Sequence, residues 1–158
     1  MFLARSHADL HNIRLGVEKV RKVSDRLIGI GPVGIGLDGV LSFLPVVGVL
    51  YSAATGAMLV LDAIRARASP SIVFRIGMLM TLNTMLDVPG GTPLGPFSGI
   101  ADTLFTAHKW SANLLTRHMD NTIYLEGSPQ QARANPQYAD LLAQSRAGKE
   151  KRRIVFLG

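Results

Sequence analysis

Residues 27–64 read LIGIGPVGIGLDGVLSFLPVVGVLYSAATGAMLVLDAI, a stretch of 38 residues that contains no lysine or arginine. Asp38 and Asp62 are its only formal charges. One membrane-spanning helix needs about 20 apolar residues, so this stretch is long enough for two passes. Pro45 and Gly48 lie near its middle, where proline removes a backbone donor and favours a turn. The stretch therefore predicts an apolar helical hairpin.

A second stretch, residues 76–108, repeats this plan. It also lacks lysine and arginine, and a cluster of prolines and glycines separates its two apolar segments. Pro96 and Gly99 occupy the places that the proline and glycine of the first turn occupy, and Asp87 precedes them as an aspartate precedes the first turn. We interpret the two stretches as a weak internal repeat, with a chance match of common residues as the alternative. The repeat predicts a second hairpin.

Basic residues border both hairpins. Arg26 precedes the first hairpin, and Arg65 and Arg67 follow it. A hairpin with basic residues at both ends begins and ends on one face of a bilayer, and the positive-inside rule makes that face cytoplasmic. We therefore expect both termini in the cytoplasm.

Residues 6–27 have the spacing of an amphipathic helix with a basic opposite face. Ser6, with Asp9 three residues later, is a candidate N-cap. The helix either lies flat on anionic lipid headgroups or packs on the rest of the domain. Its apolar positions, at steps of three and four, are Leu10, Ile13, Val17, Val20, Val23 and Leu27.

Three further helices are expected over residues 47–66, 71–87 and 99–124. After Gly127 the composition becomes polar and basic, which predicts an extended arm with one or two helical turns at 136–146. The predicted class is all-α: an amphipathic N-terminal helix, two apolar hairpins with Pro/Gly turns, and an extended basic C-terminal arm. The predicted division is an N-terminal helix (1–26), a membrane-embedded hairpin domain (27–124) and a polar tail (125–158).

The composition excludes several kinds of function. The 158 residues suit one domain, and the absence of cysteine excludes disulfides, thiolate metal sites and cysteine nucleophiles. No catalytic or nucleotide-binding motif occurs, and the one-turn spacing of His7 and His11 stands without a third metal ligand. The net charge of +6 suits anionic lipid, but an aromatic content of 6% gives little basis for stacking nucleic acid bases. We expect no enzyme activity, no cofactor, no metal and no nucleic acid partner.

The apolar core of the sequence resembles the DUF4112 family, an uncharacterised group of small membrane-associated proteins. The resemblance rests on Leu37-Asp38, on Pro45-Val-Val-Gly48 and on their counterparts in the second half, and it covers about residues 30–120. The counterparts are Leu86-Asp87, Pro96 to Gly99, Asp102 and the segment from Phe105 to Ser111. The chain departs from the family pattern at Val49, His108 and Ser111. The resemblance implies membrane association and no particular chemistry.

Charged and polar residues inside the apolar windows are the candidate sites. Asp38 and Asp87 either brace their Pro/Gly turns by accepting hydrogen bonds from free amides or handle cations or protons. Asp62 and Asp102 suit structural roles at helix ends. Arg75 and Asn83 share one helix face with Asp87, a polar stripe that predicts interhelical pairing. The expected cytoplasmic basic surface comprises Arg21, Lys22, Arg26, Arg65, Arg67, Lys149, Lys151, Arg152 and Arg153.

These patterns favour a non-enzymatic integral membrane protein of the bacterial inner membrane that acts by assembly, as a homo-oligomer or as an accessory subunit of a larger complex. Anionic lipid headgroups are its expected lipid partners. The alternative function is ion or proton permeation, with Asp38 and Asp87 lining the path. A peripheral or soluble bundle whose hairpins form a buried core is the third possibility, because helices of 16 to 18 apolar residues are short for spanning.

Overall fold

The computed structural model describes residues 3–28, 45–87 and 100–158, with side chains described for 3–22, 53–82 and 106–158. Four long helices make up most of this part of the chain, and a short C-terminal segment of two helices and two strands follows. The long helices are α1 (His7–Ile28), α3 (Pro45–Arg65), α4 (Pro70–Asp87) and α5 (Ile100–Asp120). The C-terminal segment contains β1 (Thr122–Leu125), α6 (Pro129–Ala134), α7 (Pro136–Arg146) and β2 (Arg153–Phe156). The predicted all-α class is confirmed.

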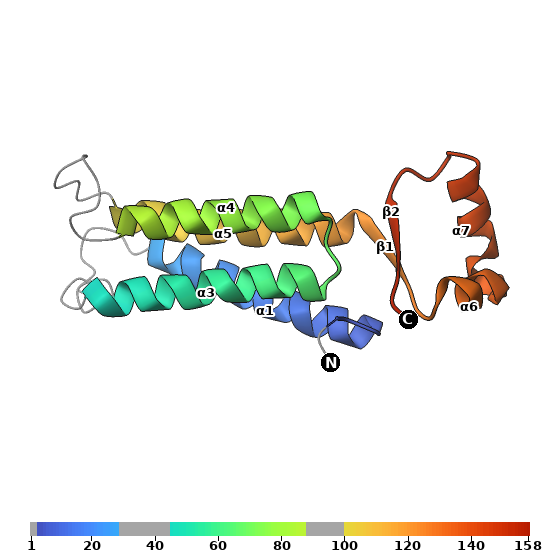
Figure 1. The fold of residues 1–158 in the computed structure, drawn as a ribbon, viewed down its shortest axis with the longest axis horizontal. Helices are drawn as coiled ribbons and strands as arrows, with labels where there is room; N and C mark the ends of the chain where they lie inside the picture. Colours follow the sequence, from blue (N-terminus) through green and yellow to red (C-terminus); the bar gives the residue numbers. More distant parts are fainter. Residues whose placement is uncertain (1–2, 29–44, 88–99) are drawn as a thin grey trace.

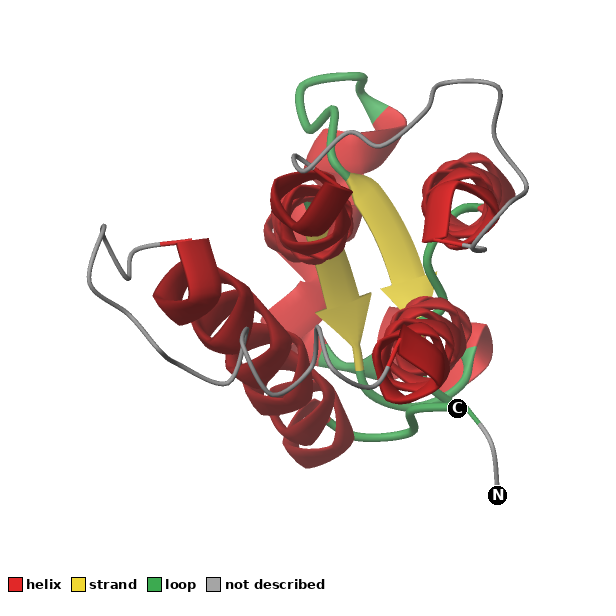
Figure 2. Ribbon diagram, turned by 90° about the vertical axis from the view of Figure 1, so that its left-hand side faces the viewer, coloured by secondary structure: helices red, strands yellow, loops and turns green. Residues whose placement is uncertain are grey.

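The long helices form a bundle (Figure 1). α5 packs against both α1 and α4, and α4 packs against α3. Figure 2 looks down this bundle, with the two strands behind it. We call one end of the bundle the turn end: it contains the start of α1, the α3–α4 connection at residues 66–69 and the last turn of α5. β1 and β2 lie beside the turn end (Figure 1).

α1 is part of the bundle core. Ser6 and Asp9 cap it reciprocally: the Asp9 amide donates to Ser6 Oγ at 3.2 Å, and the Ser6 amide donates to Asp9 Oδ2 at 3.2 Å. Leu10, Ile13 and Val17 are at most 6% exposed. Of the two interpretations of this helix, packing on the rest of the domain is the one that these buried side chains support.

α3 and α4 approach each other closely. A Cβ atom added to Gly56 would lie 3.0 Å from Met80 Sδ, so the Met80 side chain would have to shift to accept a side chain at this glycine. Pro45 is the first residue of α3, a position that tolerates proline because the missing amide has no helical partner. Gly48 lies inside α3, so its predicted place in a turn is wrong. The buried side chains between the helices include Leu59, Ala63, Ile76, Ala112, Leu115 and Met119.

The C-terminal segment is folded rather than extended, which corrects the predicted arm: α6 and α7 lie beyond the strands, and β2 returns to the turn end of the bundle (Figure 1). The helix expected to reach residue 124 ends at Asp120, because Thr122–Leu125 form strand β1, parallel to β2. The β-branched and aromatic residues of β1 suit an extended strand. Leu157, just after β2, is fully buried in the core. Pairing with a strand far along the chain is not visible in local periodicity, and for that reason the prediction failed here.

Local signals explain the other turns of this segment. Gly127 has φ +87°, a conformation that a residue with a side chain rarely adopts. Ser128 caps α6 in a reciprocal capping box with Gln131, and Asn135 Oδ1 accepts from the Gln137 amide at the start of α7. The helical turns predicted at 136–146 are confirmed as α7.

Within the described ranges, no helix combines the length and the apolar character needed to cross a membrane.

Candidate functional site at the turn end

The α3–α4 connection contains a residue in an unusual backbone conformation. Arg67 has φ +54°, and it stands where a helix normally ends with glycine: the Arg67 amide donates to the Ile64 carbonyl and the Ala68 amide to the Ala63 carbonyl. For a residue with a side chain this conformation costs about 1–2 kcal/mol. An arginine at this position therefore needs a compensating interaction.

The Arg67 guanidinium supplies that interaction by binding three backbone carbonyls. Nε donates to Ala4 at 3.2 Å, Nη1 to Phe156 at 2.9 Å and Nη2 to Leu157 at 3.0 Å. These carbonyls belong to the two ends of the chain. Arg67 therefore joins both termini to the α3–α4 connection, and its planar fork of donors suits this use better than a lysine ammonium would.

His118, in the last turn of α5, joins the same connection to β2. The Ser69 backbone amide donates to His118 Nε2 at 3.2 Å, and Arg153 Nη1 lies 3.3 Å from the same nitrogen. Arg153 Nη1 also donates to the Arg67 carbonyl at 2.8 Å. Both neighbours of Nε2 are donors, so this nitrogen carries no proton in the structure. Burial and the Arg153 guanidinium lower the pKa of His118 below its ordinary value.

The start of the chain and β1 complete this polar cluster, which we call the turn hub (residues 65–69 with the groups bonded to them). The Ala4 amide donates to the Arg65 carbonyl at 2.9 Å. The Tyr124 hydroxyl donates to the Ala66 carbonyl at 3.0 Å, and burial raises the pKa of this phenol. The turn hub thus accepts hydrogen bonds from Ala4, from Tyr124 of β1 and from Arg153 of β2, and it donates to the Phe156 and Leu157 carbonyls.

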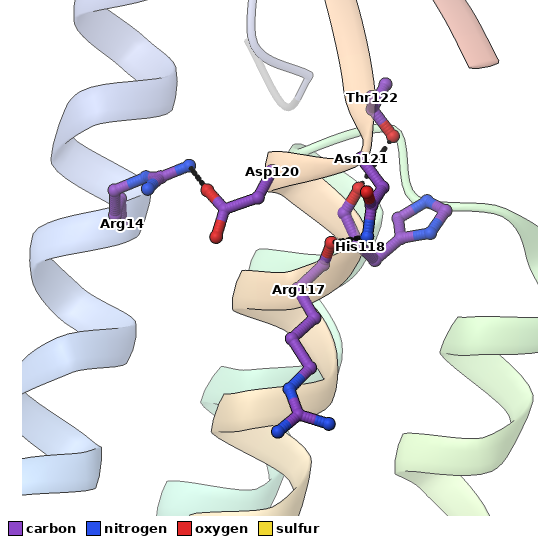
Figure 3. Close-up of polar contacts among 6 residues, drawn as sticks. All are labelled: Arg14, Arg117, His118, Asp120, Asn121 and Thr122. Carbon is purple, nitrogen blue, oxygen red and sulfur yellow. Dashed lines mark hydrogen bonds and ion pairs between the residues drawn. The ribbon is translucent and has the colours of Figure 1, made fainter. Parts of the chain in front are cut away.

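A cleft of about 390 Å³ lies beside the turn hub, between α1 and the α5–β1 junction. Its walls hold a charged pair, Arg14 with Asp120 (Figure 3). The Thr122 hydroxyl donates to the His118 carbonyl at 2.8 Å, so its proton is used within the protein. The cleft is lined by His7, Leu10, His11, Arg14, Met119, Asp120, Thr122 and Tyr124.

These groups do not form a catalytic arrangement. His118 contacts the backbone amide of Ser69, whereas the Ser69 hydroxyl lies 3.2 Å from that of Ser71. This geometry does not activate a serine, because a nucleophile needs its hydroxyl on the base. Across the described part of the chain, no group of three histidine or acidic side chains is arranged to hold a metal ion.

A different kind of surface lies on the outer side of α3 and α4. Phe74 is 70% exposed, and Met78 and Leu82 follow it at steps of four residues along α4. Met58 and Leu61 are exposed on the neighbouring helix α3. We call these five side chains the apolar face. Because α3 and α4 run antiparallel from their short connection, Leu61 lies near the level of Phe74, and Met58 near that of Met78.

Residues 14–119 match the family described as "Domain of unknown function (DUF4112)". The chain belongs to the DUF4112 family. The match runs from α1 to the last turn of α5 and so leaves the C-terminal segment outside. No curated protein and no solved structure matches the chain. The family description assigns no activity to its members.

Two of the positions at which the chain departs from the DUF4112 pattern lie inside the bundle. His108 is 4% exposed and Ser111 is fully buried, both on α5. Among the described residues, Ser111 Oγ has no hydrogen-bond partner. The third position, Val49, lies in α3 outside the described side chains.

Most of the aspartates and turn residues that the sequence singled out lie outside the residues or the side chains that the structure describes. Asp38, Pro96 and Gly99 are outside the described residues, and the side chains of Asp87 and Asp102 are outside the described side chains. The proposed ion path and the turn-bracing role therefore stay predictions. Asp62 pairs with Arg65 at 3.3 Å, as their spacing predicts.

Of the predicted polar stripe on α4, the structure describes the side chain of Arg75 alone, so the interhelical pairing stays a prediction. Arg75 is exposed on the outer side of α4, and the side chain of Asn83 is not described. Arg75 points outward because the bundle buries the opposite side of α4, at Ile76 and Met80.

The residues of the predicted basic surface differ in their exposure and in their partners. Lys22, Arg65, Lys149 and Lys151 are exposed and Arg21 is half-buried, while the side chain of Arg26 is not described. Arg67 and Arg153 belong to the turn hub, and Arg152 pairs with Glu150 at 2.8 Å. Sequence reasoning missed the turn hub because its partners lie up to 90 residues apart in the chain. The one available signal was an arginine where a helix ordinarily ends with glycine.

Proposed function

We propose that this DUF4112 protein is a non-enzymatic membrane-associated protein that acts by assembly, and that its apolar face contacts lipid. One observation carries the proposal: α4 is apolar on nearly all sides, and yet Phe74, Met78 and Leu82 are exposed. A helix that is apolar all round normally has its whole surface covered. Contiguous apolar side chains on a surface mark an interaction site for protein or membrane.

Charge favours a lipid surface as the contact. Arg65 lies one turn beyond Leu61 on α3, and Arg75 follows Phe74 on α4, so exposed cations border the apolar face. Arginines beside an apolar surface are attracted to anionic headgroups, each contributing about 1 kcal/mol. Outside the apolar face, on α5, Trp110 is 60% exposed and is an aromatic side chain of the kind enriched at membrane interfaces.

The dimensions of the face suit contact with one leaflet. From Phe74 to Leu82 the helix rises about 12 Å, less than half the hydrocarbon thickness of about 30 Å.

Assembly is supported by a second group of side chains. Ala53, Ala54 and Ala57 are exposed on α3, and small residues allow helices to approach closely in lipid. The partner is a second copy or another membrane protein.

Vesicle flotation tests the lipid contact. The wild-type protein is expected to float with vesicles, more completely when they contain phosphatidylglycerol than when they contain phosphatidylcholine alone. The triple variant Phe74→Gln, Met78→Gln, Leu82→Gln is expected to bind at least about tenfold more weakly, because each apolar side chain contributes about 1.5–3 kcal/mol when fully buried. Leu15→Gln is the matched control, since Leu15 is 43% exposed on α1, away from the apolar face.

Equal flotation of the triple variant and the wild type would contradict the lipid contact. Assembly has its own test: cross-linking of an Ala54→Cys variant in vesicles, with Arg117→Cys as the control. The chain contains no native cysteine to interfere. Cross-linked species are expected for position 54 alone, and their absence would contradict assembly through α3.

A further inference from the structure

The docking of β2 depends on few apolar contacts and on several polar ones. Within the residues that the structure describes, β2 pairs only with β1, and a two-stranded sheet is marginally stable alone. Val155 is 7% exposed and Leu157 is fully buried. The remaining attachments are the carbonyls held by Arg67 and the contacts that Arg153 makes with the turn hub.

His118 occupies a position in this attachment that only a neutral imidazole can fill. Its Nε2 faces two donors, the Ser69 amide and the Arg153 guanidinium, and it lies within 3.3 Å of both. A proton on Nε2 would remove the acceptor from the Ser69 amide. It would also place a second positive charge against Arg153.

We propose that His118 is an acid-sensitive latch: protonation of Nε2 displaces Arg153 and loosens the docking of β2 and Leu157 on the bundle. The latch is independent of the proposed membrane contact, because none of its groups belongs to the apolar face. Its consequence is the exposure of the apolar side chains of Val155 and Leu157, which are buried in the docked state.

Arg153, which approaches from β2, is the cation that disfavours protonation of His118. The Arg67 guanidinium in the α3–α4 connection binds backbone carbonyls instead, and the Arg117 side chain on α5 is directed away from His118 (Figure 3). The described acids of this end have other partners: Asp120 pairs with Arg14, Asp62 with Arg65 and Glu150 with Arg152, while Asp9 and Glu126 accept hydrogen bonds from backbone amides at the start of α1. In the described part of the chain, no carboxylate pairs with His118 to stabilise an imidazolium.

The sign of the pH effect follows from the lowered pKa of His118. The unfolded chain binds a proton at the ordinary histidine pKa of about 6.5, and the docked state binds it only at lower pH. The stability that the latch supplies is therefore fully present above about pH 6.5. It is lost as the pH falls through the pKa of the docked state.

Nuclear magnetic resonance of the full chain tests the proposal. The imidazole signals of His118 are expected to titrate below the ordinary histidine pKa of about 6.5. The Leu157 amide donates to the Leu125 carbonyl and reports on docking through its hydrogen exchange. Its protection, corrected for intrinsic exchange, is expected to fall between pH 7 and pH 5, by up to about tenfold for each pKa unit by which docking lowers the His118 value.

Two variants separate the latch from a merely structural role. His118→Gln keeps an acceptor for the Ser69 amide and does not titrate, so its Leu157 protection should no longer depend on pH. Arg153→Gln retains His118 and should raise the pH at which it titrates, which keeps the test decisive if the first variant folds poorly. Titration of His118 at or above the ordinary histidine pKa of about 6.5, or equal loss of Leu157 protection in wild type and His118→Gln, would overturn the proposal.

Discussion

The turn hub and the apolar face differ in whether their side chains find partners within the protein. At the turn hub, the guanidinium groups of Arg67 and Arg153 donate hydrogen bonds to backbone carbonyls of the protein itself. On the apolar face, Phe74 and Met78 are more than half exposed. The comparison indicates that the turn end stabilises the fold and that the α3–α4 side is available for interaction.

Truncating one apolar side chain in each region gives the largest difference. Leu157→Ala removes a fully buried side chain and is expected to lower the free energy of unfolding by about 3 kcal/mol. Phe74→Ala removes a larger side chain that is 70% exposed, and we expect a change of about 0.5 kcal/mol or less. Urea unfolding of both variants measures the two values, and equal losses would break the comparison.

Arg67 tests the polar attachment itself. Arg67→Ala removes three hydrogen bonds from a charged group while keeping the left-handed backbone, and it should cost about 2–3 kcal/mol. Arg67→Gly removes the same bonds but relieves the backbone strain, so it should be about 1 kcal/mol more stable than Arg67→Ala. The two urea midpoints test this expectation, and the midpoint of Arg67→Gly should be the higher one. Alanine as the more stable variant would contradict a strained conformation at this position.

The smallest effect is expected at the exposed Glu150–Arg152 pair. Hydrogen bonds from Arg152 lower the pKa of Glu150 to about 2. The contribution of this pair to stability is therefore present above the ordinary carboxyl pKa and is lost only as the pH falls through about 2. Solvent screens an exposed pair, so Glu150→Gln should leave the urea midpoint unchanged within error between pH 5 and pH 8. A clear loss of stability would show that the pair supports β2 docking.

The sequence predicted the elements whose determinants are local. Three- and four-residue periodicity located α1 and the apolar helices to within a few residues, and Ser69-Pro70 marked the start of α4. The prediction from the sequence failed at β1, because pairing with Arg153–Phe156 determines the conformation of this strand. Local composition at residues 121–125 does not reveal a partner that begins about 30 residues later in the chain.

The site was less predictable than the fold for the same reason. His118 and Ser69 are 49 residues apart, and Arg67 bonds carbonyls 63 to 90 residues away. No spacing rule relates such positions. The apolar windows predicted an apolar contact surface in general terms, but only the packing of Ile76 and Met80 toward the core determines which side of α4 remains exposed.

The central claim is that the apolar face contacts lipid, and depth-dependent fluorescence quenching tests it most directly. A fluorophore is attached to a single cysteine at Met78→Cys, Leu15→Cys or Arg117→Cys, and the protein is bound to anionic vesicles that carry nitroxide-labelled acyl chains. The fluorophore at position 78 should be strongly quenched, and those at positions 15 and 117 should be quenched weakly. Equal quenching at the three positions, or none at position 78, would contradict the claim.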